Sequence, residues 1–347
     1  MTSRPVVTLR AVARDVVVSG LELVPLEVWQ WLRDGQFKQG KVRAPLGRLA
    51  MRVARHRSIG ALDASFQIPD EPGVRMTNDG SFIARQVFWL GRQGHEGPEA
   101  QYWQAFCSRA KSILELGANI GFFTLHGARV APHAKYVAVE ANPVSMRSIA
   151  ANLALNGIEH VTLVQRAVVG ERTTDFVELH LPDLERSASA TGAYIGGGEG
   201  IDRPASRSVR VEVVEARELF DGVELVRLDI EGQEHDVLAS VLETIRASEP
   251  LMFVEVRRRT PKLRALLHDL ATNSGWSVHA LAPDGCHRVE AAELSTIVLQ
   301  EAFGTRDVAL VPPSRAEDFA RGMDELATRS GWVRRAPAAQ ARKPSLG

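Results

Sequence analysis

The sequence predicts an α/β fold: a doubly wound, seven-stranded, mostly parallel Rossmann-like sheet with a small N-terminal appendage. Apolar, strand-like runs alternate with helical segments from Gly80 onward, and this alternation is typical of parallel sheets with right-handed crossovers. Within it, Ser112–Gly121 (SILELGANIG) combines an apolar run, a tight glycine turn and a helix start. The next strand-like run ends at Glu140, 19 residues after Gly121, which places a carboxylate at the tip of the neighbouring strand.

The composition excludes several classes of protein. The chain has 347 residues, and its 42 basic and 42 acidic residues leave no net charge that would indicate a polyanionic partner. It has no run of 18 apolar residues and no apolar signal-peptide core near its N-terminus. Its two cysteines, Cys107 and Cys286, lack metal-ligand spacing and are expected to be free thiols. We therefore expect a cytoplasmic protein that binds neither a membrane nor nucleic acid.

Residues 1–80 form the N-terminal appendage, which we expect to complete an acceptor pocket or to make a dimer contact. Within it, PLEVWQWLRDG predicts a short helix that begins at Pro25 and stops at Gly35. The segment 38–57 carries seven Lys or Arg residues and no acidic residue. This segment predicts a solvated surface or dimer arm, or else an anchor for a phosphate-bearing ligand. A homodimer is therefore one of the open alternatives.

Residues 81–312 form the main domain, in which strands and helices alternate. The expected strands are Ser112–Leu116, Tyr136–Glu140, Val161–Gln165, Val223–Ile230 and Leu251–Val256, with an extra strand at Phe176–Leu181. The expected helices are Pro98–Cys107, Gly121–Val130, a helix from Asn142 to about Asn156, Gln233–Arg246 and Pro261–Asn273. The expected closing antiparallel pair is Trp276–Leu281 with Thr296–Glu301.

Two further segments lie between and after these elements. The glycine-rich stretch Ser187–Arg207 is expected to be a long structureless loop, and loops of this length inside a compact domain are often functional lids. Residues 313–347 are expected to form a C-terminal helix at Ala316–Arg329, followed by a disordered tail.

The glycine turn predicts a nucleoside-containing ligand. Gly117 and Gly121 are four residues apart with Asn119 between them, and glycines let backbone N–H groups approach a ligand closely. A dinucleotide site would show G-x-G-x-x-G, which seats a pyrophosphate. This spacing therefore argues against a nicotinamide dinucleotide, while Glu140 is placed to accept hydrogen bonds from two ribose hydroxyls.

A second acidic group follows the fourth expected strand. Asp229 and Glu231 lie in the run D-I-E-G, and Glu255 ends the next strand. Carboxylates concentrated where central strands meet a cleft are costly unless they bind something. A Mg²⁺ site is one alternative, because carboxylate oxygens suit that ion. We do not favour Mg²⁺ and expect no metal, since the same acids serve as general base and hydroxyl anchors.

Six segments together resemble the FkbM family of class I S-adenosylmethionine-dependent methyltransferases, over roughly Phe82 to Gln300. They are GHEGPEAQYWQAF, ILELGANIGFFTL, YVAVEANPVSMRSIAANLALNG, VQRAVVG, VRLDIEGQEHDVL and PLMFVEV. The resemblance implies O-methylation of a small-molecule hydroxyl acceptor, a sugar or natural product such as those of antibiotic biosynthesis. Two departures are Arg227, where the family usually has Lys, and His95, where an aromatic residue is usual.

The resemblance also implies roles for individual residues in binding S-adenosylmethionine. Glu115 would hold the amino group of the methionine part, Glu140 the ribose, and Ala167 would line the adenine. The other residues expected around the cofactor are Gly117, Asn119, Gly121, Thr124, Asn142 and Asp229. Asn142 has an equally weighted alternative as the N-cap of the following helix.

The expected catalytic residues are Asp229, Glu231 and Glu255. An alcohol must lose its proton as it attacks the methyl group, so either Asp229 or Glu231 is expected to be the general base, an effect of about 10²–10⁴-fold. One alternative is an N- or nucleic-acid methyltransferase, but no N-P-P-[YF] motif follows the fourth strand. The other is a non-catalytic cofactor-binding subunit, which the intact set of acids and glycines argues against.

Overall fold

The computed structural model describes residues 25–37, 64–182, 192–201 and 205–330. These residues belong to two compact units that divide at Gly97. The predicted boundary at residue 80 stays a prediction. The basic segment 38–57 and the predicted tail lie outside the described residues. No helix within the described ranges is long and apolar enough to cross a membrane.

The described part of the first unit contains two α-helices, a hairpin and a short 3-10 helix at Gly91–Gly94. Helix α2 (Leu26–Gln36) continues one residue past the predicted stop at Gly35. Strands β1 (Ser65–Gln67) and β2 (Arg75–Thr77) pair antiparallel. Helix α4 (Phe82–Leu90) begins where the hydroxyl of Ser81 accepts a hydrogen bond from the N–H of Ala84, so its start follows from an ordinary N-cap.

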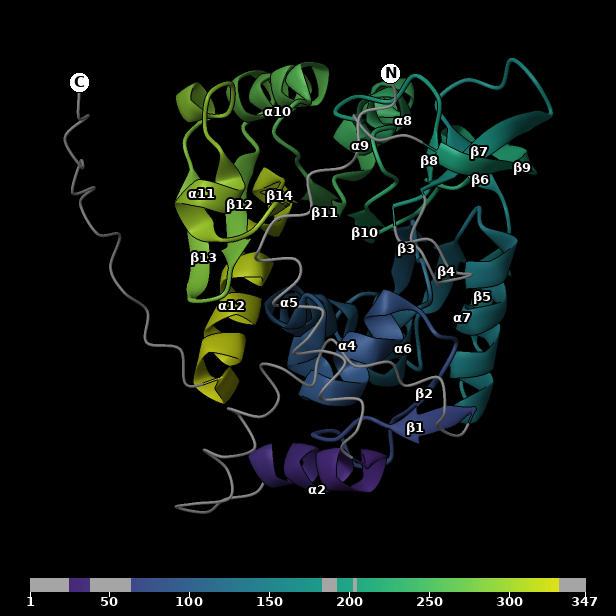
Figure 1. Cartoon of the computed structure of the whole chain (residues 1–347). Coiled ribbons are helices and arrows are strands. Elements are labelled where there is room, and N and C mark those ends of the chain that lie inside the picture. Colours follow the sequence, from purple (N-terminus) through teal and green to yellow (C-terminus); the bar gives the residue numbers. More distant parts are fainter. Residues whose placement is uncertain (1–24, 38–63, 183–191, 202–204, 331–347) are drawn as a thin grey trace, which may run out of the picture. The chain divides into compact units, whose positions relative to one another are not determined.

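The second unit is built on an eight-stranded sheet (Figure 1). Its strands, in spatial order, are β13 (Gly285–Val289), β12 (Ser277–Ala282), β14 (Asp307–Val311), β11 (Leu251–Glu255), β10 (Leu225–Leu228), β3 (Ser112–Leu116), β4 (Lys135–Val139) and β5 (Val161–Val164). The strands from β11 to β5 are parallel, and β14, β12 and β13 are antiparallel. The predicted doubly wound, mostly parallel sheet is confirmed, with eight strands in place of the seven expected.

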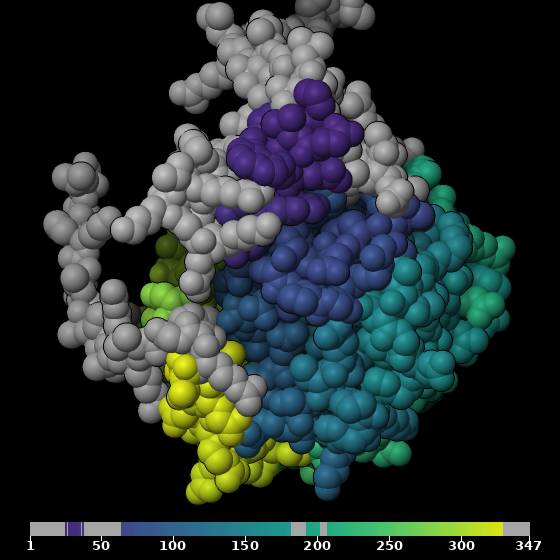
Figure 2. Space-filling model, turned by 90° about the horizontal axis from the view of Figure 1, so that it is seen from below, coloured from purple at the N-terminus to yellow at the C-terminus, as the bar shows by residue number. Residues whose placement is uncertain are grey.

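Helices cover both faces of this sheet. They are α5 (Gly97–Cys107), α6 (Phe122–Val130), α7 (Pro143–Leu155), α8 (Glu234–Ser240), α9 (Leu242–Ser248), α10 (Pro261–Asn273), α11 (Leu299–Phe303) and α12 (Ala316–Ser330). On one face, aliphatic side chains of α8, α9 and α10 pack on the sheet in a single core cluster. On the other face the packing is aromatic: Trp103 of α5 contacts Phe253 of β11, and Phe106 stacks on Phe319 of α12. Figure 2 shows α12 in yellow beside the blue residues of that layer.

The structure corrects the expected end of the sheet. The segment Thr296–Glu301 is no strand, because Leu299–Phe303 is the short helix α11. The strand that pairs with both β12 and β11 is Asp307–Val311, and β13 adds the eighth strand as a hairpin on β12. The single helix expected at Gln233–Arg246 is divided at Val241, which ends α8 and begins α9. Sequence pattern alone misplaced these elements because short apolar runs fit helix and strand equally well.

A second, four-stranded sheet lies between β5 and β10 in the chain. It consists of β6 (Ala167–Val169), β9 (Ala205–Glu215), β7 (Phe176–Pro182) and β8 (Tyr194–Ile195). The extra strand at Phe176–Leu181 is confirmed as β7, whereas β9 was not expected. The stretch Ser187–Arg207 is therefore not wholly structureless. Among its described residues, Tyr194–Ile195 pairs with β7, and its last three residues belong to β9.

Candidate functional site

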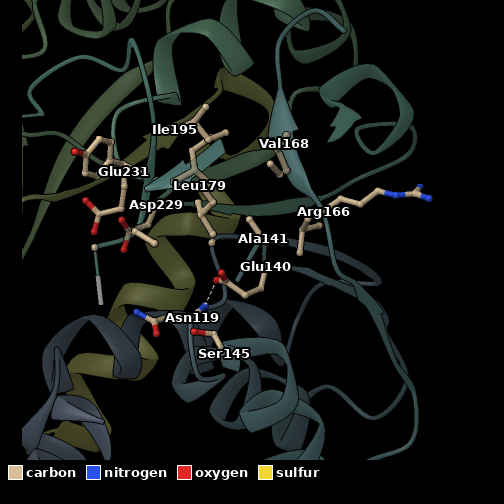
Figure 3. A pocket seen from close by; sticks show the side chains of 17 residues that line it. Asn119, Glu140, Ala141, Ser145, Arg166, Val168, Leu179, Ile195, Asp229 and Glu231 are labelled. Atoms are coloured by element: carbon tan, nitrogen blue, oxygen red, sulfur yellow. Dashed lines mark hydrogen bonds between the residues drawn. The ribbon is translucent and has the colours of Figure 1, made fainter. Parts of the chain in front are cut away.

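A pocket opens at the carboxyl ends of β3, β4 and β10, and the small sheet forms its opposite wall (Figure 3). It encloses about 650 Å³, its open mouth included. Parallel α/β sheets bind ligands at this edge, because their strand ends converge there. Six of the predicted site residues line the pocket: Gly117, Asn119, Glu140, Ala167, Asp229 and Glu231.

Glu140 follows the last residue of β4 and is held by two backbone donors. Its Oε2 accepts from the N–H of Asn119 at 2.7 Å, and its Oε1 accepts from the N–H of Asn142 at 2.7 Å. Burial raises the pKa of Glu140 to about 7, and the hydrogen bonds from Asn142 and Asn119 oppose this rise. The carboxylate is thus fixed in direction and faces the pocket with lone pairs that can accept from a ligand.

The turn after β3 requires glycine at position 117. Gly117 has a φ of +85°, and a Cβ on it would lie 1.9 Å from the carbonyl oxygen of Asp229. Asn119 also has a positive φ, 52°, a conformation that asparagine tolerates better than most residues. Its buried Oδ1 has no hydrogen-bond partner among the described residues. The turn therefore contains a buried acceptor without a partner next to the pocket, and Asn119 itself lines the pocket.

Asp229 is the first residue after β10 and lies level with the glycine turn. Its N–H donates to the carbonyl of Leu116 at 3.0 Å, and Arg227 donates to its Oδ2 at 3.1 Å. Arg227 is buried, with its guanidinium 3.7 Å from the ring centroid of Phe123. Burial would raise the pKa of Asp229, but the charges of Arg227 and Arg257 outweigh burial and lower it. Asp229 is therefore ionised at neutral pH.

Glu231 lies in a strained turn. Its φ is 55°, and its carboxylate pairs with the guanidinium of Arg257. Glu234 stabilises this turn: its carboxylate accepts from the N–H groups of Ile230 and Gly232 at 2.9–3.1 Å. Burial raises the pKa of Glu234 to about 7, against the lowering effect of Arg257. Glu234 thus acts on the shape of the turn and does not line the pocket.

Glu255 lies behind this group, outside the pocket lining. It accepts from Arg257 at 2.7 Å and pairs with Arg306 at 3.0 Å. Burial and the negative charge of Asp229 raise the pKa of Glu255 well above its usual range. One ligand atom each from Asp229, Glu234 and Glu255 lies within 4.8 Å of the others, a spacing that a metal ion could use. Guanidinium groups of Arg227, Arg257 and Arg306 already serve as counter-ions to these acids.

Four predicted cofactor residues do not line the pocket: Glu115, Gly121, Thr124 and Asn142. Glu115 is fully buried in β3 and accepts from the hydroxyl of Tyr136 at 2.5 Å. Burial raises the pKa of Glu115, and Arg227 and Tyr136 oppose this effect. Thr124 is buried on α6, and Gly121, with a φ of 81°, begins that helix. The side chain of Asn142 accepts from the N–H of Val144 at 3.0 Å and so caps α7.

Several pocket residues were not anticipated from the sequence. They are Ser145 of α7, Arg166 before β6, and Val168 and Leu179 of the small sheet. Ala193, Tyr194 and Ile195 also line the pocket, and they lie within the stretch 187–207 that was expected to be a lid. Alternation within Phe176–Leu181 places Leu179 on the buried face of its strand, which is a usable signal. No local pattern marks Tyr194, which reaches the pocket only because β8 pairs with β7.

A comparison with protein families matches residues 115–274, a little under half of the chain, to the Methyltransferase FkbM domain. The predicted resemblance is thereby confirmed for the part of the chain that contains the pocket. None of the curated proteins resembles the chain closely enough to count as a match.

Solved structures show weaker likenesses. The chain is similar to methyltransferase FkbM from Methylobacillus flagellatus, with 11% identity and a TM-score of 0.37, over 66% of this chain and 52% of that one. It is similar to the O-methyltransferase TomG from Streptomyces achromogenes, in complex with SAM, with 14% identity and a TM-score of 0.35, over 65% and 82%. It is also similar to the O-methyltransferase from Bacillus cereus in complex with SAH, with 12% identity and a TM-score of 0.34, over 62% of this chain and 80% of that one.

Proposed function

Because residues 115–274 belong to the methyltransferase FkbM domain family, we propose that this protein is an S-adenosylmethionine-dependent O-methyltransferase. The acceptor is a hydroxyl group of a sugar or natural product. The observation that carries this proposal is that one pocket is lined by a carboxylate bound to backbone N–H groups and by two carboxylates paired with arginines. Glu140 is fixed by two backbone donors at one side, and Asp229 and Glu231 lie beyond the glycine turn.

The residues of the pocket suit S-adenosylmethionine. Glu140 would accept from the ribose hydroxyls, and the side-chain amide of Asn119, which also lines the pocket, would add a polar contact. Ala167 and Val168 offer an apolar surface for the adenine, with Leu179 and Ile195 on the small sheet. The absence of a side chain at Gly117 leaves the turn open to the ligand. A pyrophosphate would have to lie beside these carboxylates, which disfavours a dinucleotide.

Bound S-adenosylmethionine supplies an electrophilic methyl group on a positively charged sulfur. The protein aligns the acceptor and removes its hydroxyl proton, and alignment is the larger contribution when the leaving group is neutral. We assign the proton acceptor to Asp229, with Glu231 as the second candidate. Asp229 is fixed to the end of β10 by its N–H bond to Leu116, and rigid elements hold reactive groups more accurately than turns do. Arg227 keeps Asp229 ionised and oriented.

Binding of S-adenosylhomocysteine tests the cofactor. We expect calorimetry to give micromolar-range affinity for it and no binding of nicotinamide dinucleotides. Glu140→Ala should weaken the affinity by about 1.5–3 kcal/mol, because it removes a charged acceptor. Glu178→Ala is a matched control, since Glu178 is an exposed carboxylate on β7. Dinucleotide binding with no binding of S-adenosylhomocysteine would refute the proposal.

Turnover with a labelled methyl donor tests the acceptor class. A panel of sugars and hydroxylated natural products should include acceptors that become labelled, whereas amines and nucleic acids should not. Labelling confined to amines or nucleic acid would support the alternative enzyme classes. Binding without any product across the panel would favour a non-catalytic subunit.

A further inference from the structure

The segment 192–201 forms one wall of the pocket. Gly192, Ala193, Tyr194 and Ile195 line it, and the strand that contains the last two has only two residues paired with β7. A two-residue strand pair is a weak attachment, because isolated short pairings are marginally stable in water. Some other contact must hold this wall in place against the pocket.

Glu199 supplies such a contact with its side chain. Its Oε1 accepts from the N–H of Lys262 at 3.0 Å, and its Oε2 accepts from the N–H of Leu263 at 3.1 Å. These donors belong to the first turn of α10, whose own N-cap residue, Thr260, makes no side-chain capping bond. A carboxylate at a helix N-terminus is stabilised by both the free N–H groups and the helix dipole. Glu199 therefore caps α10 from a distant part of the chain.

The backbone of the same residue is tied to the turn that carries the catalytic acids. The N–H of Glu199 donates to the carbonyl of Gly232 at 2.8 Å. A Cβ on Gly232 would lie 2.7 Å from the carbonyl oxygen of Glu199, and Gly232 has a φ of +96°. A Cβ on Gly198 would lie 3.0 Å from the oxygen of Gly232. The two segments approach backbone to backbone, and this approach requires the glycine of the D-I-E-G run.

We propose that Glu199 is a positioning residue that clasps the 192–201 wall to the Gly232 turn and to α10, and that this clasp retains the ligand in the pocket. It connects Tyr194 and Ile195 on one side to Asp229 and Glu231 on the other. A loosened wall would let the ligand leave more easily, so the clasp slows dissociation. That the ligand is S-adenosylmethionine or S-adenosylhomocysteine rests on the proposed function.

The dissociation rate of S-adenosylhomocysteine from the full chain, measured by stopped-flow displacement, tests the clasp. In Glu199→Ala both side-chain bonds are lost, and we expect dissociation roughly tenfold faster or more. In Glu199→Gln one amide oxygen remains to accept from a single N–H group, so the rate should lie between those of Glu199→Ala and the wild type. Glu178→Gln, which removes an exposed carboxylate from the same small sheet, should leave the rate unchanged.

Hydrogen exchange separates the clasp from a simple helix cap. The clasp predicts that Glu199→Ala loses protection both at Lys262 and Leu263 and at Tyr194 and Ile195. Lost protection at α10 alone, with a wild-type dissociation rate, would mean that Glu199 only caps the helix and would overturn the proposal. If Glu199→Ala does not fold, the Glu199→Gln rate decides: a wild-type value overturns the clasp. Failure of the wild type to bind S-adenosylhomocysteine would instead overturn the proposed function, and the clasp's role with it.

Discussion

At the residue scale, Glu140 combines a fixed direction with a pKa near neutrality. Two backbone N–H groups hold its oxygens, while burial raises its pKa to about 7. A carboxyl group with a raised pKa keeps its proton to a higher pH, so Glu140 is mostly protonated at pH 6 and mostly ionised at pH 8. Hydroxyl donors bind the ionised form more strongly. The protonation state of one side chain therefore sets the acceptor strength at this side of the pocket.

We expect the affinity for S-adenosylhomocysteine to rise from pH 6 to pH 8. The rise should be up to roughly tenfold, with its midpoint near pH 7, because only the ionised fraction of Glu140 offers full acceptor strength. Calorimetry across this range measures it. Glu140→Gln should bind more weakly and lose the dependence. A dependence that persists in Glu140→Gln would assign the titration to another group, with Glu234 first because its pKa is also raised to about 7.

Also at this scale, the base can be identified by charge-removing substitutions. Asp229→Asn should lower turnover by roughly 10²-fold or more and leave the affinity for S-adenosylhomocysteine nearly intact, whereas Glu231→Gln should have the smaller effect. Acceptor turnover and calorimetry on the same variants measure the two quantities. A chelator should not change wild-type activity. Loss of activity that added Mg²⁺ restores would show instead that Asp229, Glu234 and Glu255 hold a metal ion.

At the scale of elements, the start of α7 shows which part of Asn142 has a structural role and which part contacts a pocket residue. The side chain of Asn142 caps the helix, but its contact with Glu140 is made by the backbone N–H. Asn142→Ala should therefore cost about 1 kcal/mol of stability in urea unfolding, the usual loss for an N-cap. It should leave the affinity for S-adenosylhomocysteine nearly unchanged. Asn273→Ala, at the exposed end of α10, is the control.

The opposite result would restore the other interpretation of Asn142. A tenfold or larger loss of affinity without loss of stability would show that the amide of Asn142 contacts the cofactor.

The D-I-E-G run likewise separates structural from binding positions, because three of its residues occupy different places. Asp229 follows the strand, Glu231 occupies the left-handed turn, and Gly232 lies where the 192–201 segment approaches.

At the scale of the second unit, strand order brings the functional residues together. β3 lies between β4 and β10, so Gly117, Glu140 and Asp229 meet at one edge although they are spread over more than 100 residues. The small sheet then closes the other side of the pocket (Figure 3). Arg227, Arg257 and Arg306 pair with Asp229, Glu231 and Glu255 at this edge, and such pairing offsets part of the cost of burying a carboxylate.

The sequence by itself determined the α/β class, the parallel core strands and the positions of Glu140, Asp229 and Glu231. These follow from local periodicity and from acids placed at strand ends, which need no knowledge of distant contacts. The tertiary structure alone decided that Glu115 faces the helical layer and Tyr136. Its strand continues to Leu116, and side chains alternate between the faces of a sheet. The tertiary structure also decided that β8 forms a wall and that Glu199 caps α10. Glu199 lies more than 60 positions from the N–H groups that it accepts from, and the energy of such contacts comes from groups that meet only after the chain has folded.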